Sequence, residues 1–327
     1  MRAVVCEKLG QPEDLVFKSD WELPELGPQD VLVEVKAAAL NFPDILVVQG
    51  KYQMKPELPF VPGGECAGVV LEVGSEVSNC KPGDDVISMA VSGAFAERIV
   101  AHSASLMPKP AGLDYRQASG IGITYFTSYY ALKQRAALQP GETLLVLGAG
   151  GGVGTTAVEL GKAMGAKVIA AASSDEKLAL AKEKGADELI NYNEQPLKDT
   201  VKKLTGGKGV DVVYDPVGGD YSEQALRAMA WNGRFLVIGF ANGPIPKIPL
   251  NLTLLKGCSI VGVFWGAFAA VEPEVQQRNV KELWDMFESG RLSPVVTDVF
   301  PLADYVEAFN CLANRQARGK VILDMTQ

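Results

Sequence analysis

One stretch of this chain, LVLGAGGGVGTTAVELGKAMGA, limits the possible folds more than any other. An apolar run at 144–147 leads into a cluster of glycines, and a helical pattern follows in which Val153, Ala157 and Leu160 share one face. Glycines let the backbone turn tightly, and a helix N-terminus offers unpaired N–H groups and a positive dipole end to a phosphate. The order strand, glycine loop, helix therefore predicts a dinucleotide-binding unit, the alternative being a plain glycine-rich turn.

Two registers of the G-x-G-x-x-G pattern are possible in this loop. A pattern that starts at Gly148 puts Val153 in the last glycine position, which fails. A pattern that starts at Ala149 puts Gly151 and Gly154 in the two positions that matter most for approach to a diphosphate. We therefore expect the cofactor phosphates to contact Gly151, Gly152, Val153 and Gly154.

The end of the next predicted strand indicates which dinucleotide binds. An acidic residue about 20 residues past the loop would hold the ribose 2′-hydroxyl of NAD. Here the strand ends in Ala-Ala-Ser-Ser, and Ser173, Ser174 and Lys177 suit a 2′-phosphate. We predict NADP(H). Two alternatives stay open: Ser174 or Asp175 caps the following helix, or Asp175 binds a ribose.

The chain on either side of the loop has two different patterns. Residues 1–120 contain short strands broken by Gly and Pro, with an alternation at 31–35 that indicates half-exposed strands. From about 120 the chain repeats strand and helix, and its strands are apolar without alternation, as in parallel sheets covered on both faces. We predict an α/β fold with a doubly wound Rossmann domain at 122–266, and a β-rich domain formed by 1–121 and 267–327.

Composition narrows the function further. The chain has 327 residues, 47% of them apolar, and a net charge of −8, which disfavours a nucleic-acid partner. It contains no apolar run long enough to span a membrane, and its N-terminal segment lacks the apolar core of a signal peptide. The five cysteines are scattered, which predicts free thiols and a cytoplasmic location. A single histidine, His102, argues against a metal centre.

Several segments together carry a family resemblance: AALNFPDILVVQGKY, LPFVPGGECAGVV, GAGGGVG, AASSDEKLALAKEKGAD, INY and VVYDPVGG. In combination, and over nearly the whole chain, the sequence resembles the zinc-independent, ζ-crystallin-like quinone oxidoreductases of the medium-chain dehydrogenase/reductase superfamily. The resemblance implies a GroES-like, partly open β-barrel catalytic domain, a Rossmann domain, an active site between them and a homodimer. The family loop normally reads Ala-Ala-Gly-Gly-Val-Gly, and Ala149-Gly150 is a small departure from it.

The same resemblance bears on metal binding. In the zinc alcohol dehydrogenases of this superfamily, a Gly-His-Glu turn supplies a zinc-binding histidine and an earlier cysteine supplies another ligand. Here Gly64 stands at the histidine position, and Asn41 stands at the cysteine position. Without a metal there is no Lewis acid to make an alcohol acidic, so we expect no metal and no alcohol oxidation. We expect Glu65 to have a structural or supporting role near the cofactor.

The resemblance also implies site residues. Asn41 and Tyr52 would lie near the nicotinamide or substrate, with Tyr52 a possible proton donor and Asp44 orienting the pocket; the alternative for Tyr52 is a surface aromatic. The implied cofactor contacts beyond the glycine loop and the serines are Thr127, Tyr192, Val217, Phe240, Asn242, Phe264, Trp265, Arg318 and Lys320. For each of these, core packing or a solvated surface position is the alternative.

The leading hypothesis is an NADPH-dependent oxidoreductase that transfers hydride to a quinone. The main rival within enzymes is a reductase of 2-alkenals, enones or enoyl-CoA thioesters. A non-catalytic NADPH-binding structural protein is a third possibility, and an RNA-binding protein a less favoured fourth. The apolar segment CSIVGVFWG reads as an edge strand that pairs with its counterpart in a homodimer.

Overall fold

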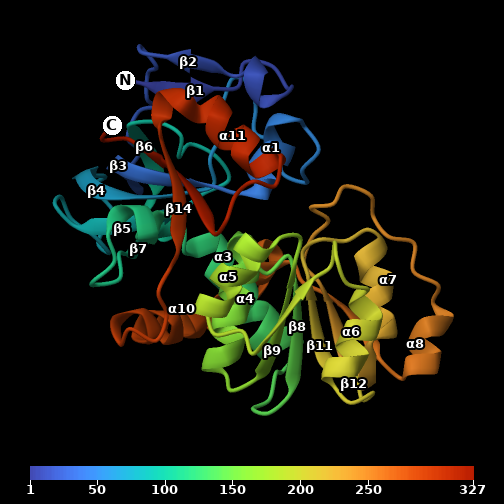
Figure 1. Cartoon of the computed structure of the whole chain (residues 1–327). Helices are drawn as coiled ribbons and strands as arrows, with labels where there is room; N and C mark the ends of the chain where they lie inside the picture. The colour runs from blue at the N-terminus through green and yellow to red at the C-terminus, as the bar shows by residue number, and fades with distance from the viewer. The chain divides into compact units, whose positions relative to one another are not determined.

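The computed structural model describes all residues from 1 to 327, and the chain forms two compact units (Figure 1). One unit combines Met1–Ile123 with Ser293–Gln327, so it contains both chain ends, and the other unit is Thr124–Leu292. The chain therefore passes between the units only twice.

The second unit is built on a six-stranded sheet with the order β10-β9-β8-β11-β12-β13. All of its strand pairs are parallel, and helices connect most successive strands. Its elements are α3 (Gly122–Tyr130), a π-helical turn (Ala131–Arg135), β8 (Thr143–Leu147), α4 (Gly152–Ala163), β9 (Lys167–Ala172), α5 (Asp175–Glu183), β10 (Glu188–Asn191), α6 (Leu197–Leu204), β11 (Val210–Asp215), α7 (Asp220–Arg227), β12 (Met229–Val237), α8 (Asn251–Lys256), β13 (Ser259–Gly262), α9 (Trp265–Val271) and α10 (Pro273–Glu288).

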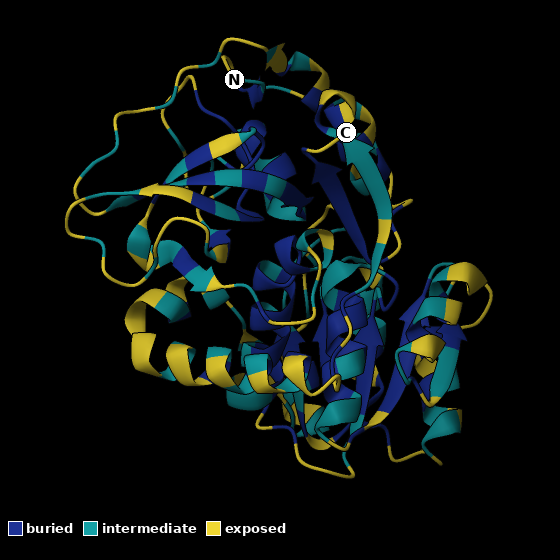
Figure 2. Cartoon of the chain, turned by 90° about the vertical axis from the view of Figure 1, so that its left-hand side faces the viewer, coloured by how far each residue is buried: buried dark blue, intermediate teal, exposed yellow.

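The central strands of this sheet are buried on both faces, as their continuous apolar runs predict. Figure 2 shows these strands mostly dark blue, and in β8 every residue after Thr143 is buried. Leu145 and Leu147 pack in one cluster with Leu197 and Val201 of α6 and Leu226 of α7. Because the strands are parallel, they all end at one common carboxyl edge, where open α/β sheets bind their ligands.

The first unit is built on a seven-stranded, mostly antiparallel sheet with the order β14-β15-β3-β4-β5-β7, in which β6 also pairs with β3. A separate two-stranded sheet joins β1 and β2. Its elements are β1 (Ala3–Val5), β2 (Val16–Lys18), β3 (Asp30–Leu40), α1 (Phe42–Val48), β4 (Glu65–Val73), β5 (Asp85–Met89), β6 (Arg98–His102), β7 (Leu106–Pro108), α2 (Tyr115–Ser119), β14 (Val296–Pro301), α11 (Tyr305–Ala313), β15 (Lys320–Asp324) and 3-10 turns at Pro12–Asp14, Ser103–Ser105 and Leu302–Asp304.

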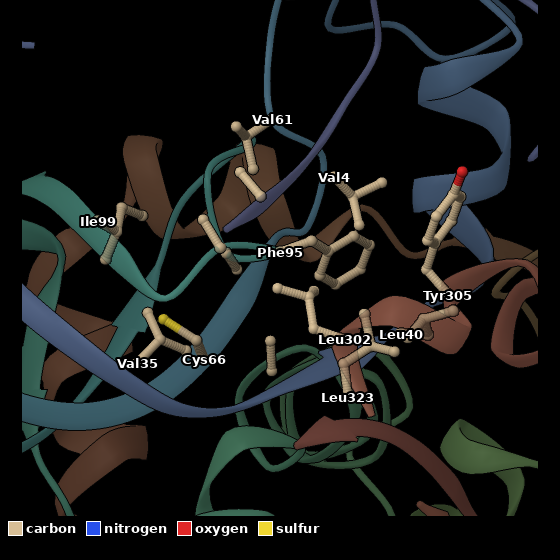
Figure 3. Packing of buried hydrophobic residues seen from close by; sticks show 14 of the residues in the cluster. Val4, Val35, Leu40, Val61, Cys66, Phe95, Ile99, Leu302, Tyr305 and Leu323 are labelled. Carbon is tan, nitrogen blue, oxygen red and sulfur yellow. The ribbon is translucent and has the colours of Figure 1, made fainter. Parts of the chain in front are cut away.

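The core of the first unit joins its two chain segments. Figure 3 shows Phe95, from the N-terminal segment, beside Leu302 and Leu323 of the C-terminal segment. Phe95 also meets Phe309 edge to face, with ring centroids 5.8 Å apart. The buried Tyr305 keeps its hydroxyl satisfied by donating to the carbonyl of Leu15 at 2.7 Å. The C-terminal segment is therefore an integral part of this unit.

These two units confirm the predicted fold class of a Rossmann sheet with a GroES-like domain, but the boundary near the C-terminus differs. The structure places α10 in the second unit and moves the return to the first unit from residue 267 to residue 293. The reason is packing: Phe287 of α10 meets Tyr125 of α3 edge to face at 4.9 Å, and Trp284 stacks on Phe126 at 5.9 Å. The helical pattern alone did not carry this information.

No helix of the chain combines the length and the apolar character that crossing a bilayer requires.

Candidate functional site

The glycine loop of the second unit has the geometry of a phosphate cradle. After β8, Gly148 takes a left-handed conformation with φ of 59°, and Gly151 is the N-cap residue of α4. A Cβ on Gly154 would lie 2.1 Å from the carbonyl oxygen of Gly148, so no larger residue fits there. Position 154, the last glycine of the register that starts at Ala149, thus requires a glycine.

The first turn of α4 is open to a ligand. Gly151 has no side chain to cap the helix, so the N–H groups of Gly152 and Val153 have no acceptor in the chain. A Cβ on Gly151 would have only the Gly148 carbonyl oxygen nearby, at 3.5 Å, which leaves room for a group that approaches the backbone. The loop therefore fits a diphosphate, whose charge the helix dipole stabilises.

Lys177, Ser173 and Asn193 gather at the carboxyl end of β9. The Nζ of Lys177 lies 3.5 Å from the Oγ of Ser173, and Asn193 donates to the Ser173 carbonyl at 2.8 Å. The stem of Lys177 also packs against Gly150, where a Cβ would come within 2.5 Å of it. The Lys177 side chain thus starts against the glycine loop and ends with its ammonium beside Ser173. Asn193, directly after the INY motif, is a neighbour that the sequence did not predict.

Ser174 and Asp175 resolve the alternatives left open for this strand end. Ser174 is the N-cap of α5, and its Oγ accepts the N–H of Lys177 at 3.5 Å. Asp175 accepts a hydrogen bond from the amide of Asn191 at 3.0 Å. The predicted capping role of Ser174 is therefore real, and its hydroxyl can still donate to an anion.

Tyr192 lies at the same edge and pairs with a second aromatic. Its ring centroid is 4.2 Å from that of Tyr221, which begins α7 together with Asp220. The Tyr221 hydroxyl donates to Asn193 at 3.4 Å. The expected cofactor neighbour Tyr192 thus belongs to a fixed aromatic pair, and no sequence signal pointed to Tyr221.

Val217, Phe240 and Asn242 meet beyond the ends of β11 and β12. The Asn242 N–H donates to the Val217 carbonyl at 2.8 Å. A Cβ on Gly218 would lie 3.0 Å from the Phe240 ring. The structure therefore brings these three predicted residues together at the carboxyl edge of the sheet.

Asp215 holds the turn after β11, and sequence reasoning missed it. One carboxylate oxygen accepts the N–H groups of Val217 and Gly218 at 2.8 and 2.9 Å, and the other accepts the Ser222 hydroxyl at 2.5 Å. Burial raises the pKa of this carboxyl, and these hydrogen bonds oppose the increase. Asp215 thus shapes the loop that presents Val217.

The remaining predicted residues of the second unit lie on α3 and α9. Phe264 is half-exposed directly before α9, just past the end of β13. Trp265 packs on Phe126, with centroids 5.5 Å apart, and its indole donates to Gln276 at 3.1 Å. Thr127 is half-buried on α3. Trp265 is therefore held by its own packing, whereas Phe264 and Thr127 keep accessible atoms.

A cluster of buried polar side chains lies in the first unit, where β3 ends between β15 and β4. Antiparallel pairing of β15 with β3 puts Lys320 beside Asn41, and pairing of β3 with β4 brings Glu65 to the same end. Lys320 donates to the Glu65 carboxylate at 3.0 Å, to the Asn41 side-chain carbonyl at 2.7 Å and to the Leu40 carbonyl at 3.0 Å. The amide nitrogen of Asn41 donates to Glu65 at 2.8 Å.

These contacts correct the expected role of Lys320. Its side chain is only 8% exposed, and its three N–H protons all have acceptors within the first unit, so none remains for a cofactor phosphate. Arg318, in contrast, is exposed. Both polar groups of the Asn41 side chain are likewise used inside the cluster, so this residue holds Glu65 and Lys320 in place rather than reaching outward.

Asp44 and Tyr52 lie beside this cluster. The Asp44 carboxylate accepts the Asn41 N–H at 2.7 Å, as in half of a capping box for α1. Burial raises the pKa of Asp44 to about 7, and the charge of Glu65 adds to the increase. Burial and the charge of Asp44 raise the pKa of the half-buried Tyr52, which keeps its phenol protonated over the neutral range.

The donor set of this cluster does not fit zinc. The structure contains no group of three or more His, Cys, Asp and Glu side chains that could hold a metal ion. Cys66, the cysteine next to Glu65, is buried, and burial together with the Glu65 charge raises the pKa of its thiol to about 12. Lys320 already neutralises Glu65. The residues present therefore supply no zinc site.

Known proteins are similar to this chain over its whole length, in both units. Residues 27–138 match the family described as "Alcohol dehydrogenase GroES-like domain" and residues 152–288 the family described as "Zinc-binding dehydrogenase". The chain is 42% identical to a "Quinone oxidoreductase-like protein 2 homolog" of Nematostella vectensis, with 100% of this chain and 89% of the relative covered. It is 36% identical to human "Quinone oxidoreductase", covering 99% and 97%.

A solved structure is similar throughout. The crystal structure of Escherichia coli quinone oxidoreductase complexed with NADPH superimposes with a TM-score of 0.91 at 29% identity, covering 99% of this chain and 100% of the other.

Proposed function

Since the chain belongs to the zinc-independent quinone oxidoreductase family of the medium-chain dehydrogenase/reductase superfamily, we propose that it binds NADPH and transfers hydride to a quinone without a metal. One observation carries the nucleotide part of this proposal. The open first turn of α4 and the group formed by Lys177, Ser173 and Asn193 lie together, with Lys177 packed against Gly150. This spacing suits a diphosphate and a 2′-phosphate on one molecule.

The bound nicotinamide would supply the hydride, and the protein supplies binding and orientation. In the second unit, the amides of Gly152 and Val153 would hold the diphosphate. The proposed neighbours of the nicotinamide half are Thr127, Val217, Phe240, Asn242 and Phe264. A quinone needs little activation, because the negative charge that develops on its oxygen is delocalised over the ring. Tyr52, whose phenol stays protonated, is the proposed donor to that oxygen.

The absence of a metal is part of this proposal and rests on the donor set. Lys320 takes the place that a cation would need beside Glu65, so no Lewis acid is available to lower the pKa of an alcohol. We therefore propose reduction of conjugated acceptors rather than oxidation of alcohols. Turnover that survives exhaustive chelation supports this, and activity that needs added zinc contradicts it.

A second candidate function is reduction of 2-alkenals or enoyl thioesters. The protonated phenol of Tyr52 favours this second function. Hydride transfer to an enal or enoyl thioester leaves an enolate whose carbon must be protonated by a donor, whereas a reduced quinone does not need a donor on the protein. NADPH oxidation measured against a quinone, a 2-alkenal and acryloyl-CoA distinguishes the two. Tight NADPH binding without turnover of any of the three would instead support a structural role.

We also propose a homodimer in a reducing compartment such as the cytoplasm. β13 is one of the two edge strands of the parallel sheet, and four large apolar side chains around it are exposed. They are Trp231, Leu250, Leu254 and Leu255, each more than two-thirds exposed. A second copy would cover this edge and these side chains. All five cysteines are free thiols, which suits reducing conditions. Sedimentation of wild type and of Ile260→Lys on β13 tests the dimer, which the charge should dissociate.

A further inference from the structure

The two places where the chain passes between the units are both anchored in the first unit. The first passage lies between Ile123 and Thr124, and the second lies between Leu292 and Ser293. The segments that lead into each passage are far apart in the sequence. The first contacts the carboxylate of the buried ion pair between Glu65 and Lys320, and the second contacts the backbone of Lys320.

Glu65 holds the first passage. One oxygen of its carboxylate accepts the N–H of Ile123 at 2.9 Å. Ile123 is the second residue of α3, so the carboxylate satisfies an N–H at the start of this helix and lies at the positive end of its dipole. Just upstream, Gly120 packs on the Lys320 side chain, where a Cβ would come within 2.9 Å of Lys320 Cε. A single carboxylate thereby fixes where α3 begins.

Lys320 holds the second passage through its backbone. Its N–H donates to the Val295 carbonyl at 3.2 Å, and the parallel pairing of β14 with β15 starts at Val296 opposite Lys320. Pro294 accepts a further hydrogen bond from Gln117 of α2 at 3.5 Å. The chain is therefore fixed to β15 two residues after it enters the first unit.

The ion pair joins the two anchors, because Lys320 Nζ donates to the other oxygen of the same Glu65 carboxylate at 3.0 Å. Glu65 is 1% exposed and Lys320 6%, so this contact is protected from water. We propose that Lys320 is a positioning residue that, through Glu65, fixes the chain at the first passage and so sets the start of α3, the helix that carries Thr127.

The consequence for the reaction follows from where the nucleotide binds. The phosphate loop and the serine pocket lie entirely in the second unit, so the anchor does not touch them. Loss of the anchor should leave NADPH affinity nearly unchanged and should lower kcat, because small displacements of groups near the reacting atoms are costly. Loss of a residue that only stabilised the fold would not lower kcat while leaving NADPH affinity unchanged.

Lys320→Met, Glu65→Gln and the double variant test the proposal, with Glu142→Gln as the control. Glu142 pairs with Arg234 within the second unit, at 2.7 Å and partly buried, away from both passages. Amide hydrogen exchange, NADPH affinity, Tm and kcat are measured for each. Lys320→Met and Glu65→Gln should each speed exchange at Ile123 by about tenfold, since a charged hydrogen bond is lost, while residues 293–296, which are bonded to the Lys320 backbone, and the strands β8 and β9 stay protected.

The double variant separates positioning from stability. It removes both buried charges, so its Tm should recover toward wild type. We expect kcat to stay about tenfold low, with NADPH affinity within about twofold of wild type. Recovery of kcat together with Tm, or a loss of protection spread evenly over both units, overturns the proposal. Exchange and NADPH binding require no turnover, so they test the anchor even if the proposed acceptor is wrong, and Glu65→Gln gives the same readouts if Lys320→Met does not fold.

Discussion

The carboxylate of Asp44 accepts the backbone N–H of Asn41 at 2.7 Å, inside a cluster in which two carboxyl groups face a single ammonium. Lys320 pairs directly with Glu65, so the second carboxyl, Asp44, lacks an ion-pair partner of its own. Burial raises the pKa of Asp44 to about 7, whereas an unfolded aspartate titrates near 4. With one ammonium facing two carboxyl groups, Asp44 therefore stays protonated below neutral pH.

This proton makes the stability of the first unit depend on pH. Between about pH 4 and about pH 7 the folded state binds a proton that the unfolded state has released, so the free energy of unfolding falls as pH rises through this window. Asp44→Asn removes this contribution, which is at most about 4 kcal/mol. We expect wild type to lose Tm relative to Asp44→Asn between pH 4.5 and pH 7.5, roughly the limits of that window. Parallel Tm profiles would contradict the assignment.

Tyr52→Phe should separate the two candidate acceptors. Removing the phenol should lower kcat for a 2-alkenal by about 100-fold, because the enolate then lacks its proton donor, and should lower quinone turnover less. NADPH affinity should stay the same, since Tyr52 is not part of the nucleotide-binding loop. Steady-state kinetics with both acceptors check this, and equal rates for wild type and variant with both would exclude Tyr52 as a donor.

Lys177→Met should change the choice of nucleotide. The variant loses a charge-assisted hydrogen bond to the 2′-phosphate, so the Kd for NADPH should rise by about tenfold or more while that for NADH stays constant. Lys281→Met is the control, because Lys281 pairs with Asp285 on the exposed face of α10. Calorimetric titration with both nucleotides measures the effect. An equal loss for NADH and NADPH would mean that Lys177 serves only the diphosphate.

Gly154→Ala should disrupt the phosphate cradle. The added Cβ would lie 2.1 Å from the Gly148 carbonyl oxygen, so the loop must shift and NADPH affinity should fall by about tenfold or more. Gly262→Ala is a matched control: Gly262 has no atom within 4 Å of an added Cβ and no left-handed φ. If the two variants bind NADPH equally well, the close approach of Gly154 to Gly148 has no part in binding.

The parts of the site whose residues lie close together in the sequence could be predicted from the sequence. The glycine loop lies between a buried strand and an amphipathic helix, so local pattern and phosphate chemistry determine Gly151 and Gly154 together. Val217, Phe240 and Asn242 could be placed because parallel strands end at one edge of the sheet. In each case the position depends on neighbours only a few residues away.

The parts that depend on distant segments could not be predicted. Lys320 lies 255 residues from Glu65, and the two come together only because β3 pairs with both β15 and β4, so its sequence context gave no sign of a buried partner. In the sequence, Asp215 is simply the last residue of a predicted strand, and only the structure shows the hydrogen bonds by which it holds the following turn. For α10, aromatic contacts with α3 decide which unit it joins, and periodicity does not report them.

The most direct test of the account follows a single turnover of NADPH deuterated at the transferable position, with a quinone, after exhaustive chelation. We expect the bound nucleotide to be oxidised with a primary isotope effect and at an undiminished rate in the metal-free protein. NADPH that binds but is not oxidised by any conjugated acceptor, or oxidation that returns only when zinc is restored, would contradict it.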